Sequence, residues 1–475
     1  MRIIGEVPAV HSASKRRHSS LLQPGHRHET SNKRRLFAET ETLTLAPLTT
    51  CTTPALRTNY AASSHSSFRT HCKHKKRQRI KPSTAEGDRK WVYSTLSNLS
   101  HYKDKVVLLS YNILAVENAS KHQDLYSKVP PKYLDWNCRK KLLYEEISRY
   151  SASILCLQEV DRFNDVNDLL EKDGFRGVYQ ARTGEACDGC AIFWKTELYT
   201  LLHQESIEFQ MFGLRNNVAQ LCVLKSRSLL VGNIHVLFNP KRGDIKLGQI
   251  RLFLKKAHEL SQEWGNIPVV LAGDFNSIPQ VICSLVIVNF FVCKRIHGFS
   301  FPFHVQSAMY QFLAVAELDL QLHDRRNISG AIYPLEYQPF QHHNNYAVRR
   351  FSSWSSVSRP PIYRWSCEEL CFATGTEGVT HLRHPLNLSS AYRGVHGCDV
   401  TRDNHGEPLA TSYHSNFMGT VDYIWHTQEV VPVRVLDTLP IDILREVGGL
   451  PSKTWGSDHL ALVCELAFAD GVNEK

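Results

Sequence analysis

The sequence has no run of the roughly 18–20 apolar residues that a membrane-spanning helix requires. Its longest approach, residues 281–293, is too short and is followed at once by Lys294 and Arg295. The first residues also lack the compact apolar core of a secretory signal. We therefore expect a protein with no membrane span, no secretory leader and no membrane partner.

A regular cysteine framework is absent as well. The 13 cysteines are odd in number and scattered over the chain, which is typical of a reducing compartment rather than of a secreted disulfide scaffold. Cys187 and Cys190 have the spacing of a zinc knuckle, but no second pair lies at a matching distance. We interpret them as ordinary thiols.

Acidic residues are scarce at the start of the chain. Residues 1–90 contain 18 Lys and Arg but 6 Asp and Glu, a net charge of +12, whereas the remaining residues contain 38 and 40, a net charge of −2. The first 90 residues are also rich in Ser, Thr and His and show little apolar periodicity. This composition predicts a disordered basic tail over residues 1–90 and a nearly neutral folded body over residues 91–475.

The tail also carries the signals for location. "KHKKRQR", residues 73–79, is a basic cluster of the kind that serves as a nuclear address or a nucleic-acid contact, although a merely solvated tail would look the same. Nucleus and cytoplasm are therefore the expected compartments. An Arg- and Ser-rich leader is also typical of transit peptides to the mitochondrion or chloroplast, an alternative that Glu6, Glu29, Glu39 and Glu41 weaken.

The folded body alternates between strands and helices. Apolar, β-branched stretches predict strands at residues 105–114, 153–160, 190–195, 217–225, 229–238, 268–276, 419–426 and 459–466. Amphipathic patterns over residues 137–150 and 246–264 predict helices. Strands are numerous and the loops between them are frequent. The pattern predicts an α/β fold, a four-layer α-β-β-α sandwich in which two face-to-face sheets are flanked by helices.

Polar side chains recur where these predicted strands end. A single carboxylate beside a strand usually caps a loop, but six such positions indicate a shared chemical rim. Carboxylate and amide oxygens suit Mg²⁺ or Mn²⁺ better than zinc. Without a glycine-rich phosphate loop, they favour metal-assisted hydrolysis of a phosphate ester over kinase chemistry. The residues are Asn112, Glu159, His235 with Asn239, Asp274 with Asn276, Asp422, and Asp458 with His459.

These stretches resemble a known superfamily. "SYNIL", "LQEVD", "GNIHVLFNP", "GDFNS", "GTVDYIW" and "GSDHLAL", in this order, are similar to the motifs of the endonuclease/exonuclease/phosphatase superfamily. "NPKRGDIKLGQ" and "DGCAIFW" narrow the resemblance to poly(A)-shortening nucleases of the carbon catabolite repressor 4 type, in a plant form. The resemblance covers residues 89–468 with one interruption, and no leucine-rich repeats precede it.

The resemblance implies a role for each motif residue. Glu159 would be the metal ligand, with Asn112 beside it. Asp274 and Asn276 would orient and activate the attacking water and hold the scissile phosphate, which His235 would also contact. Asp422 and His459 would form an Asp–His pair, and Asp458 would support the metal or the water. The implied substrate-binding residues are Asn239, Pro240 and Phe417, of which the last two would sandwich an adenine ring.

The expected function follows from the same resemblance. It implies an enzyme that depends on Mg²⁺, or on Mn²⁺, and removes poly(A) from mRNA in the 3′-to-5′ direction with release of 5′-AMP. Its partners would be poly(A) RNA and a multi-subunit deadenylase complex. Two alternatives stay open: a nocturnin-like phosphatase or phosphodiesterase on a nucleotide cofactor, and a catalytically impaired RNA-binding pseudo-enzyme.

One segment interrupts the resemblance. After "SIPQ", residues 277–280, the familiar pattern resumes only at Ser307. Residues 281–306 contain no acidic residue and are rich in Val, Ile and Phe, a composition that favours aggregation. We interpret this segment as an atypical insertion, a translated intron rather than an evolved element. A genuine family-specific loop is the alternative.

Overall fold

The computed structural model describes residues 89–95, 104–281, 305–330 and 365–469. The chain divides into two units, Met1–Arg79 and Ile80–Lys475, and all of these residues belong to the second. The predicted tail up to residue 88 and residues 282–304 of the atypical insertion lie outside the described residues. No helix within these ranges is both long and apolar enough to cross a membrane.

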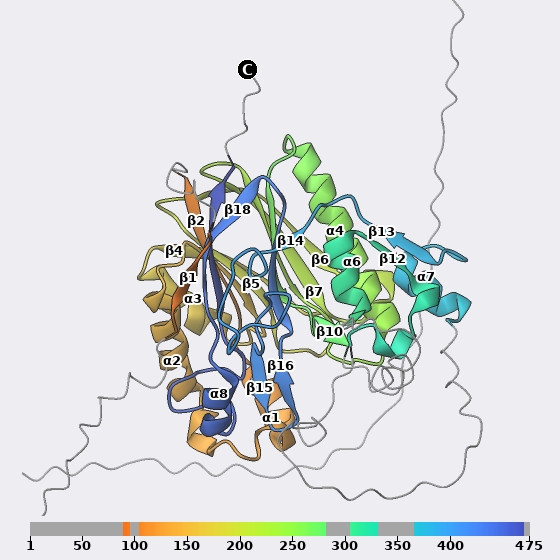
Figure 1. The fold of residues 1–475 in the computed structure, drawn as a ribbon. Helices are drawn as coiled ribbons and strands as arrows, with labels where there is room; N and C mark the ends of the chain where they lie inside the picture. The colour runs from red at the N-terminus through yellow and green to blue at the C-terminus, as the bar shows by residue number, and fades with distance from the viewer. Residues whose placement is uncertain (1–88, 96–103, 282–304, 331–364, 470–475) are drawn as a thin grey trace, which may run out of the picture. The chain divides into compact units, whose positions relative to one another are not determined.

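Two large mixed sheets form the centre of the described unit (Figure 1). The first has seven strands in the order β1 (Trp91–Tyr93), β18 (Val430–Leu436), β19 (Leu462–Phe468), β2 (Lys105–Asn112), β3 (Ile154–Gln158), β5 (Gly189–Lys195) and β4 (Phe175–Ala181). The second has six strands in the order β14 (Ser389–Ser390), β17 (Asp422–His426), β9 (Val269–Asp274), β8 (Leu229–His235), β7 (Val218–Lys225) and β6 (Thr200–Glu208). Neighbouring strands run antiparallel except for two parallel pairs, β2 with β3 and β8 with β9.

Smaller elements complete the described ranges. The two-stranded ribbons are β10 (Gln280–Val281) with β11 (Val305–Gln306), β12 (Glu317–Asp319) with β13 (His381–Arg383), and β15 (Ser412–His414) with β16 (Phe417–Gly419). The α-helices are α1 (Val116–Lys121), α2 (Trp136–Arg149), α3 (Phe163–Glu171), α4 (Gly243–Glu263), α6 (Ala308–Val315), α7 (Cys367–Thr374) and α8 (Ile441–Val447).

The layers follow from the alternation of side chains along the central strands. In β2, Leu108 faces the core between the sheets, whereas Leu109 packs with α2 and α3 on the outer face of the first sheet. In β9, Val270 faces the core between the sheets, whereas Leu271 packs against α4 and α6. Strands that are apolar on both faces need cover on both sides. The result is the predicted α-β-β-α sandwich, with α2 and α3 on one side and α4 and α6 on the other (Figure 1).

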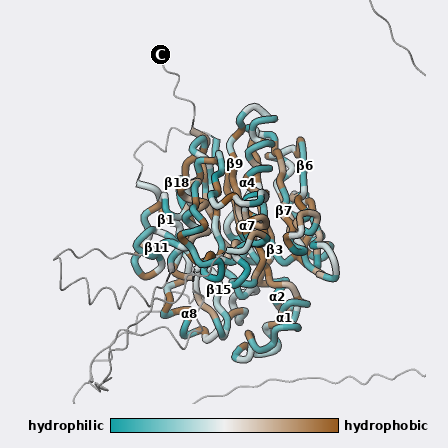
Figure 2. Tube along the Cα trace, turned by 90° about the vertical axis from the view of Figure 1, so that its right-hand side faces the viewer, coloured by the Kyte–Doolittle hydropathy of each residue, from teal (hydrophilic) through white to brown (hydrophobic). Residues whose placement is uncertain are grey.

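Hydropathy follows the same layering. In Figure 2, brown hydrophobic stretches run along the strands, whereas teal predominates in the connecting loops. All the predicted strands and both predicted helices are present, with ends shifted by a few residues. β8 ends at His235 rather than at residue 238, because the amide of Leu237 turns away to donate to Gln249 Oε1 of α4. This early end places His235 at the rim of the sheet.

Candidate active site

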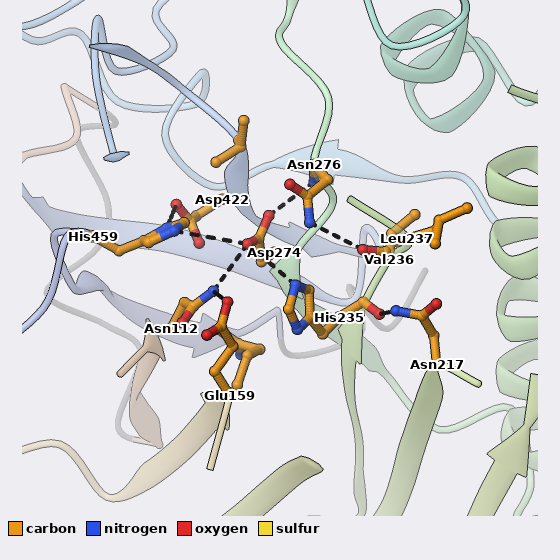
Figure 3. Close-up of polar contacts among 12 residues, drawn as sticks. Asn112, Glu159, Asn217, His235, Val236, Leu237, Asp274, Asn276, Asp422 and His459 are labelled. Carbon is orange, nitrogen blue, oxygen red and sulfur yellow. Dashed lines mark hydrogen bonds and ion pairs between the residues drawn. The ribbon is translucent and has the colours of Figure 1, made fainter. Parts of the chain in front are cut away.

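Most of the polar residues at the predicted strand ends meet at one end of the two sheets. Figure 3 shows Asn112, Glu159, His235, Asp274, Asn276, Asp422 and His459 there. Parallel pairing brings the ends of β2 and β3 together, and likewise those of β8 and β9. β17 runs antiparallel to β9, so its first residue, Asp422, lies opposite Asp274, the last residue of β9. β19 runs antiparallel to β2, and His459 precedes it by three residues. Topology therefore gathers residues that are up to 347 positions apart in the chain, Asn112 and His459.

Asn112 links two carboxylates of the site by hydrogen bonds. Its Nδ2 donates to Glu159 Oε1 at 3.0 Å and to Asp274 Oδ2 at 3.1 Å. Its Oδ1 accepts from the amide of Leu114 at 3.0 Å. Asn112 thus presents a donor, not its oxygen, to the two carboxylates. Its expected role as a metal ligand stays a prediction, and its observed contacts make it the residue that spaces Glu159 from Asp274.

Glu159 is held as an ionised carboxylate. It follows β3 with a backbone φ of 54°, a left-handed conformation that non-glycine residues seldom adopt and that often marks functional sites. Its Oε2 accepts from Asn118 Nδ2 at 2.8 Å and from the Ala115 amide at 3.1 Å. Burial alone would raise the pKa of Glu159, but nearby His235 and the donated hydrogen bonds outweigh it and lower that pKa.

The Gly-Asp-Phe-Asn turn fixes Asp274. Gly273 has φ 149° and a Cβ there would lie 2.0 Å from the Ile234 carbonyl oxygen, so only glycine fits. Asn276 has φ 49° and donates its amide to Asp274 Oδ1 at 2.8 Å. The buried Lys246 of α4 donates to the Asn276 carbonyl from behind. Burial, together with the nearby Asp422 carboxylate, raises the pKa of Asp274 to about 7.

Asp422 and His459 form the predicted pair. His459 Nδ1 lies 2.9 Å from Asp422 Oδ2, and His459 Nε2 lies 3.9 Å from Asp274 Oδ2. Burial alone would lower the pKa of His459, but the carboxylates of Asp422 and Asp458 outweigh it and raise that pKa well above its ordinary value. Asp458 also accepts from the Tyr126 hydroxyl at 2.9 Å. His459 is therefore a cation at neutral pH.

In contrast to the cationic His459, His235 is a neutral histidine. Its Nε2 lies 3.6 Å from Asp274 Oδ2. Burial lowers the pKa of His235 to about 4, although Glu159 opposes this shift. Its Nδ1 is buried without a hydrogen-bond partner among the described residues. His235 is therefore a neutral imidazole that lines the cleft described below.

A cleft of about 770 Å³ opens over these residues. Its volume falls in the range of small-molecule sites. Phe417 lines it, as the resemblance implied, but Asn239 and Pro240 are not among the described residues that do. Phe238, which is 62 % exposed, takes their place on the cleft wall. The lining also includes Glu159, His235, Asp274, Asn276, Asp458 and His459.

Sequence reasoning did not single out several residues of this cleft. Most of these residues could not be predicted, because they do not follow a predicted strand or because they lie in a stretch without clear periodicity. Phe238 sits inside the motif "GNIHVLFNP" and could have been found there as a large apolar residue at the end of the predicted strand 229–238. The others carry no such signal. The cleft residues in this group are Asn118, Arg182, Phe238 and His414.

The donor set fits a divalent cation. Four buried or half-buried carboxylates converge, while His235 is neutral, so negative charge is in excess. Asp422 Oδ1 and His235 Nδ1 are buried without partners among the described residues. Asp274, Asp422 and His459 each offer a ligand atom within 4.8 Å of the others, but a protonated His459 cannot bind a metal. The ionised Glu159 is the better anchor for the ion, with Asp274 beside it.

The arrangement suits hydrolysis of a phosphate ester. A bound Mg²⁺ would neutralise charge on the phosphate and make a coordinated water more acidic. Asp274, whose pKa lies near neutrality, can take a proton from water. The cationic His459 can stabilise the charge that develops on phosphate oxygens. Asp422 holds its ring in place, as an aspartate behind a catalytic histidine does in general.

Comparisons with known proteins agree with this geometry. The sequence model of the "Endonuclease/Exonuclease/phosphatase family" matches residues 109–280. Carbon catabolite repressor protein 4 homolog 5 of Arabidopsis thaliana is 50 % identical over 96 % of each chain. Carbon catabolite repressor protein 4 homolog 3 of the same plant is 44 % identical over 80 % of this chain and 79 % of its own. Homolog 5 therefore shares the higher identity.

A solved structure shares the fold. The crystal structure of ANGEL2, described as a 2′,3′-cyclic phosphatase in complex with adenosine-2′,3′-vanadate, aligns with a TM-score of 0.60 at 27 % identity. The alignment covers 80 % of this chain and 99 % of ANGEL2. The fold, the strand-end residues and two plant relatives all lead to one assignment. The chain belongs to the endonuclease/exonuclease/phosphatase family, among its carbon catabolite repressor 4 homologs.

Proposed function

We propose that this protein is a Mg²⁺-dependent 3′-to-5′ exoribonuclease that shortens poly(A) tails and releases 5′-AMP. The observation that carries this function is the convergence of Glu159, Asp274 and His459 in one cleft that Phe417 and Phe238 also line. Asp422 holds His459 from outside the cleft lining. The charged residues suit a phosphodiester, and the two aromatic rings suit stacked bases, which every single-stranded nucleic acid offers. The similarity to carbon catabolite repressor 4 homologs supports an RNA tail as this phosphodiester.

The sequence resemblance extends this function to partners and compartments. Poly(A) RNA is the proposed substrate, and a multi-subunit deadenylase complex is the proposed assembly. The basic cluster at residues 73–79 favours the nucleus and cytoplasm. This nuclear signal can be tested by cell fractionation of two tagged full-length proteins, the wild type and a variant whose basic residues within 73–79 are neutralised. We expect only the variant to be lost from the nuclear fraction.

A second candidate function is phosphatase activity on RNA ends. The likeness to ANGEL2, with a TM-score of 0.60 over 80 % of this chain, favours it. The two functions leave different products. An exoribonuclease releases 5′-AMP from RNA that ends in a 3′-hydroxyl. A cyclic phosphatase leaves the length of such RNA unchanged and removes the phosphate only from RNA that ends in a 2′,3′-cyclic phosphate.

The test is product analysis with a matched pair of variants. Purified full-length protein is given two 5′-labelled A-tailed RNAs, one that ends in a 3′-hydroxyl and one that ends in a 2′,3′-cyclic phosphate. Each is incubated in Mg²⁺ or in EDTA. We expect stepwise shortening in Mg²⁺ and silence in EDTA. Glu159→Gln should slow shortening by roughly 10²–10³-fold, the usual loss when a charge-stabilising group is removed. Glu145→Gln, on the exposed face of α2, should leave the rate unchanged.

Three outcomes would contradict the assignment. Shortening that persists in EDTA would exclude metal dependence. Release of phosphate from the cyclic end, without shortening of the 3′-hydroxyl RNA, would favour the phosphatase. Binding of RNA without any product in Mg²⁺ would make the protein a pseudo-enzyme.

A further inference from the structure

The β15–β16 hairpin carries a histidine into the cleft that the chemistry above does not use. Its strand β15 is tied to the catalytic rim, because Ser412 forms an isolated bridge with His459 and the Tyr413 amide donates to the Asp458 carbonyl at 2.8 Å. The next residue, His414, pairs across the hairpin with Phe417, and their ring centroids lie 5.9 Å apart. His414 therefore lies beside the ring proposed to hold the base and close to His459, the cation that can stabilise the phosphate.

His414 presents a neutral N–H donor to this space. Its side chain is 7 % exposed and lines the cleft. Its Nδ1 accepts the Asn416 amide at 3.3 Å, which leaves the ring proton on Nε2. No described residue forms a hydrogen bond with that Nε2. Burial also lowers the pKa of His414, against the opposing pull of Asp458, so the ring stays uncharged at neutral pH.

The part of a nucleotide that joins phosphate to base is the ribose. We propose, on the basis of the nuclease function inferred above, that His414 Nε2–H binds the 2′-hydroxyl of the nucleotide whose base packs on Phe417. A neutral donor suits a hydroxyl oxygen, whereas a charged donor would suit phosphate better. The 2′-hydroxyl is also the group by which a protein distinguishes RNA from DNA at a given position. His414 would thus be the specificity residue for the sugar.

A preference for RNA follows from the burial of this histidine. With a ribose in place, the Nε2–H has an acceptor. With a deoxyribose in place, the donor is closed off from water without a partner, which costs free energy. The expected discrimination is about tenfold, the effect of one neutral hydrogen bond.

The test compares two labelled decamers of adenosine, one entirely ribose and one with deoxyadenosine at its last two positions. Binding to the full-length chain is measured by fluorescence anisotropy in EDTA, so that no cleavage occurs. The wild type should bind the ribose form about tenfold more tightly. His414→Ala should reduce this ratio to about one, mainly by weakening the ribose form. His414→Gln keeps an N–H donor and should restore part of the ratio.

Phe417→Ala is the matched control. It should weaken both decamers and keep their ratio, because base stacking does not depend on the sugar. The inference is overturned if the wild type binds both forms equally, or if His414→Ala and His414→Gln leave the ratio unchanged. The nuclease function is judged separately from 5′-AMP release in Mg²⁺. Release of 5′-AMP without a preference for ribose would reject only the role of His414. A preference for ribose without release of 5′-AMP would reject only the nuclease function.

Discussion

Glu159 and Asp274 receive hydrogen bonds from the same amide group, yet their pKa values shift in opposite directions. Glu159 has further donors, from Asn118 and the Ala115 amide, and its pKa is lowered. Asp274 is buried and faces Asp422, and its pKa is raised to about 7. Two carboxylates with separated pKa values usually have separate roles. Glu159 stays charged and suits a cation, whereas Asp274 can exchange a proton near neutral pH.

The Asp422–His459 pair gives a prediction for the pH dependence of the rate. In the wild type, Asp422 is the largest of the influences that raise the pKa of His459 against burial, so the ring stays charged well above pH 6.5. Asp422→Asn removes this influence, and burial then favours the neutral ring. We expect turnover in Mg²⁺ to fall by roughly 10²–10⁴-fold. The loss should grow as the pH rises from 6 to 8, because His459 then loses its proton within that range.

The measurement is turnover on A-tailed RNA between pH 5.5 and 9 for both proteins, with thermal melting to show that the variant is folded. Glu145→Gln again serves as the control, since it changes an exposed carboxylate on α2. An equal loss at every pH would mean that Asp422 only orients the ring.

Residue motifs predicted most of the site, and the exceptions have a physical cause. A carboxylate at the end of an apolar strand stands out in a sequence, so Glu159, Asp274 and Asp422 could be found. His414 ends the three-residue strand β15, just before a two-residue turn, and in so short a strand no periodicity indicates which way a side chain points. Pro240 was expected in the cleft, but the chain after His235 turns so that Phe238 lies there instead.

At the scale of elements, the innermost strands could be predicted, whereas the edge strands and β18, next to the edge strand β1, could not. β2, β3, β8 and β9 are apolar on both faces because both faces are covered. β6 lies at the edge of its sheet, and its residues alternate between exposed and half-buried, so its sequence "TLLHQESIE" reads as polar. Whether such a stretch becomes an edge strand depends on pairing with strands that are far away in the chain. The local sequence pattern carries no information about that pairing.

The short β10–β11 ribbon joins the two ends of the atypical insertion, residues 281–306. Gln280 pairs with Gln306, and the Ser307 amide donates to the Pro279 carbonyl at 3.1 Å. The two ends of the segment are therefore already side by side. Ser307 also caps α6 by accepting from the Tyr310 amide, and removal of residues 281–306 would keep Ser307 in the chain. The match to the family model ends at residue 280, where the insertion begins.

We predict that joining Gln280 directly to Ser307 gives a more soluble and more active enzyme. Loop length alone changes the free energy of unfolding little, so the expected gain comes from removal of an apolar segment without acidic residues. Soluble yield, light scattering and turnover are compared with the full chain. A Gly-Ser linker in place of residues 282–304 is the control for content. Transcripts should mostly encode the joined form, and equal performance of all three proteins would contradict the intron hypothesis.

For the whole molecule, charge is separated between the tail and the described unit. Residues 1–88 contain 16 Lys and Arg and 6 Asp and Glu, whereas residues 89–475 contain 40 of each. If RNA is the substrate, as proposed above, we expect the long-range attraction to it to come mainly from the first 88 residues. Arg89 belongs to the folded part, because its Nε donates to the Asp437 carbonyl at 2.8 Å and its Nη1 lies 3.3 Å from buried Glu146. The boundary after residue 90 stays a prediction, and Arg89 is the residue next to it whose contacts the structure describes.

This boundary decides how the tail should be tested. A chain without residues 1–88 keeps Arg89 and should bind A-tailed RNA with a flatter dependence on salt, because fewer counterions are released. Its turnover at saturating RNA should be unchanged. A chain without residues 1–90 should show the same salt slope but a lower melting temperature, since Glu146 would be buried without its cation. Binding measured between 50 and 200 mM salt, which is about the range where such slopes are resolved, distinguishes the cases. If removal of residues 1–88 leaves the slope unchanged, the tail is an address or a passive extension, and RNA is held by the cleft alone.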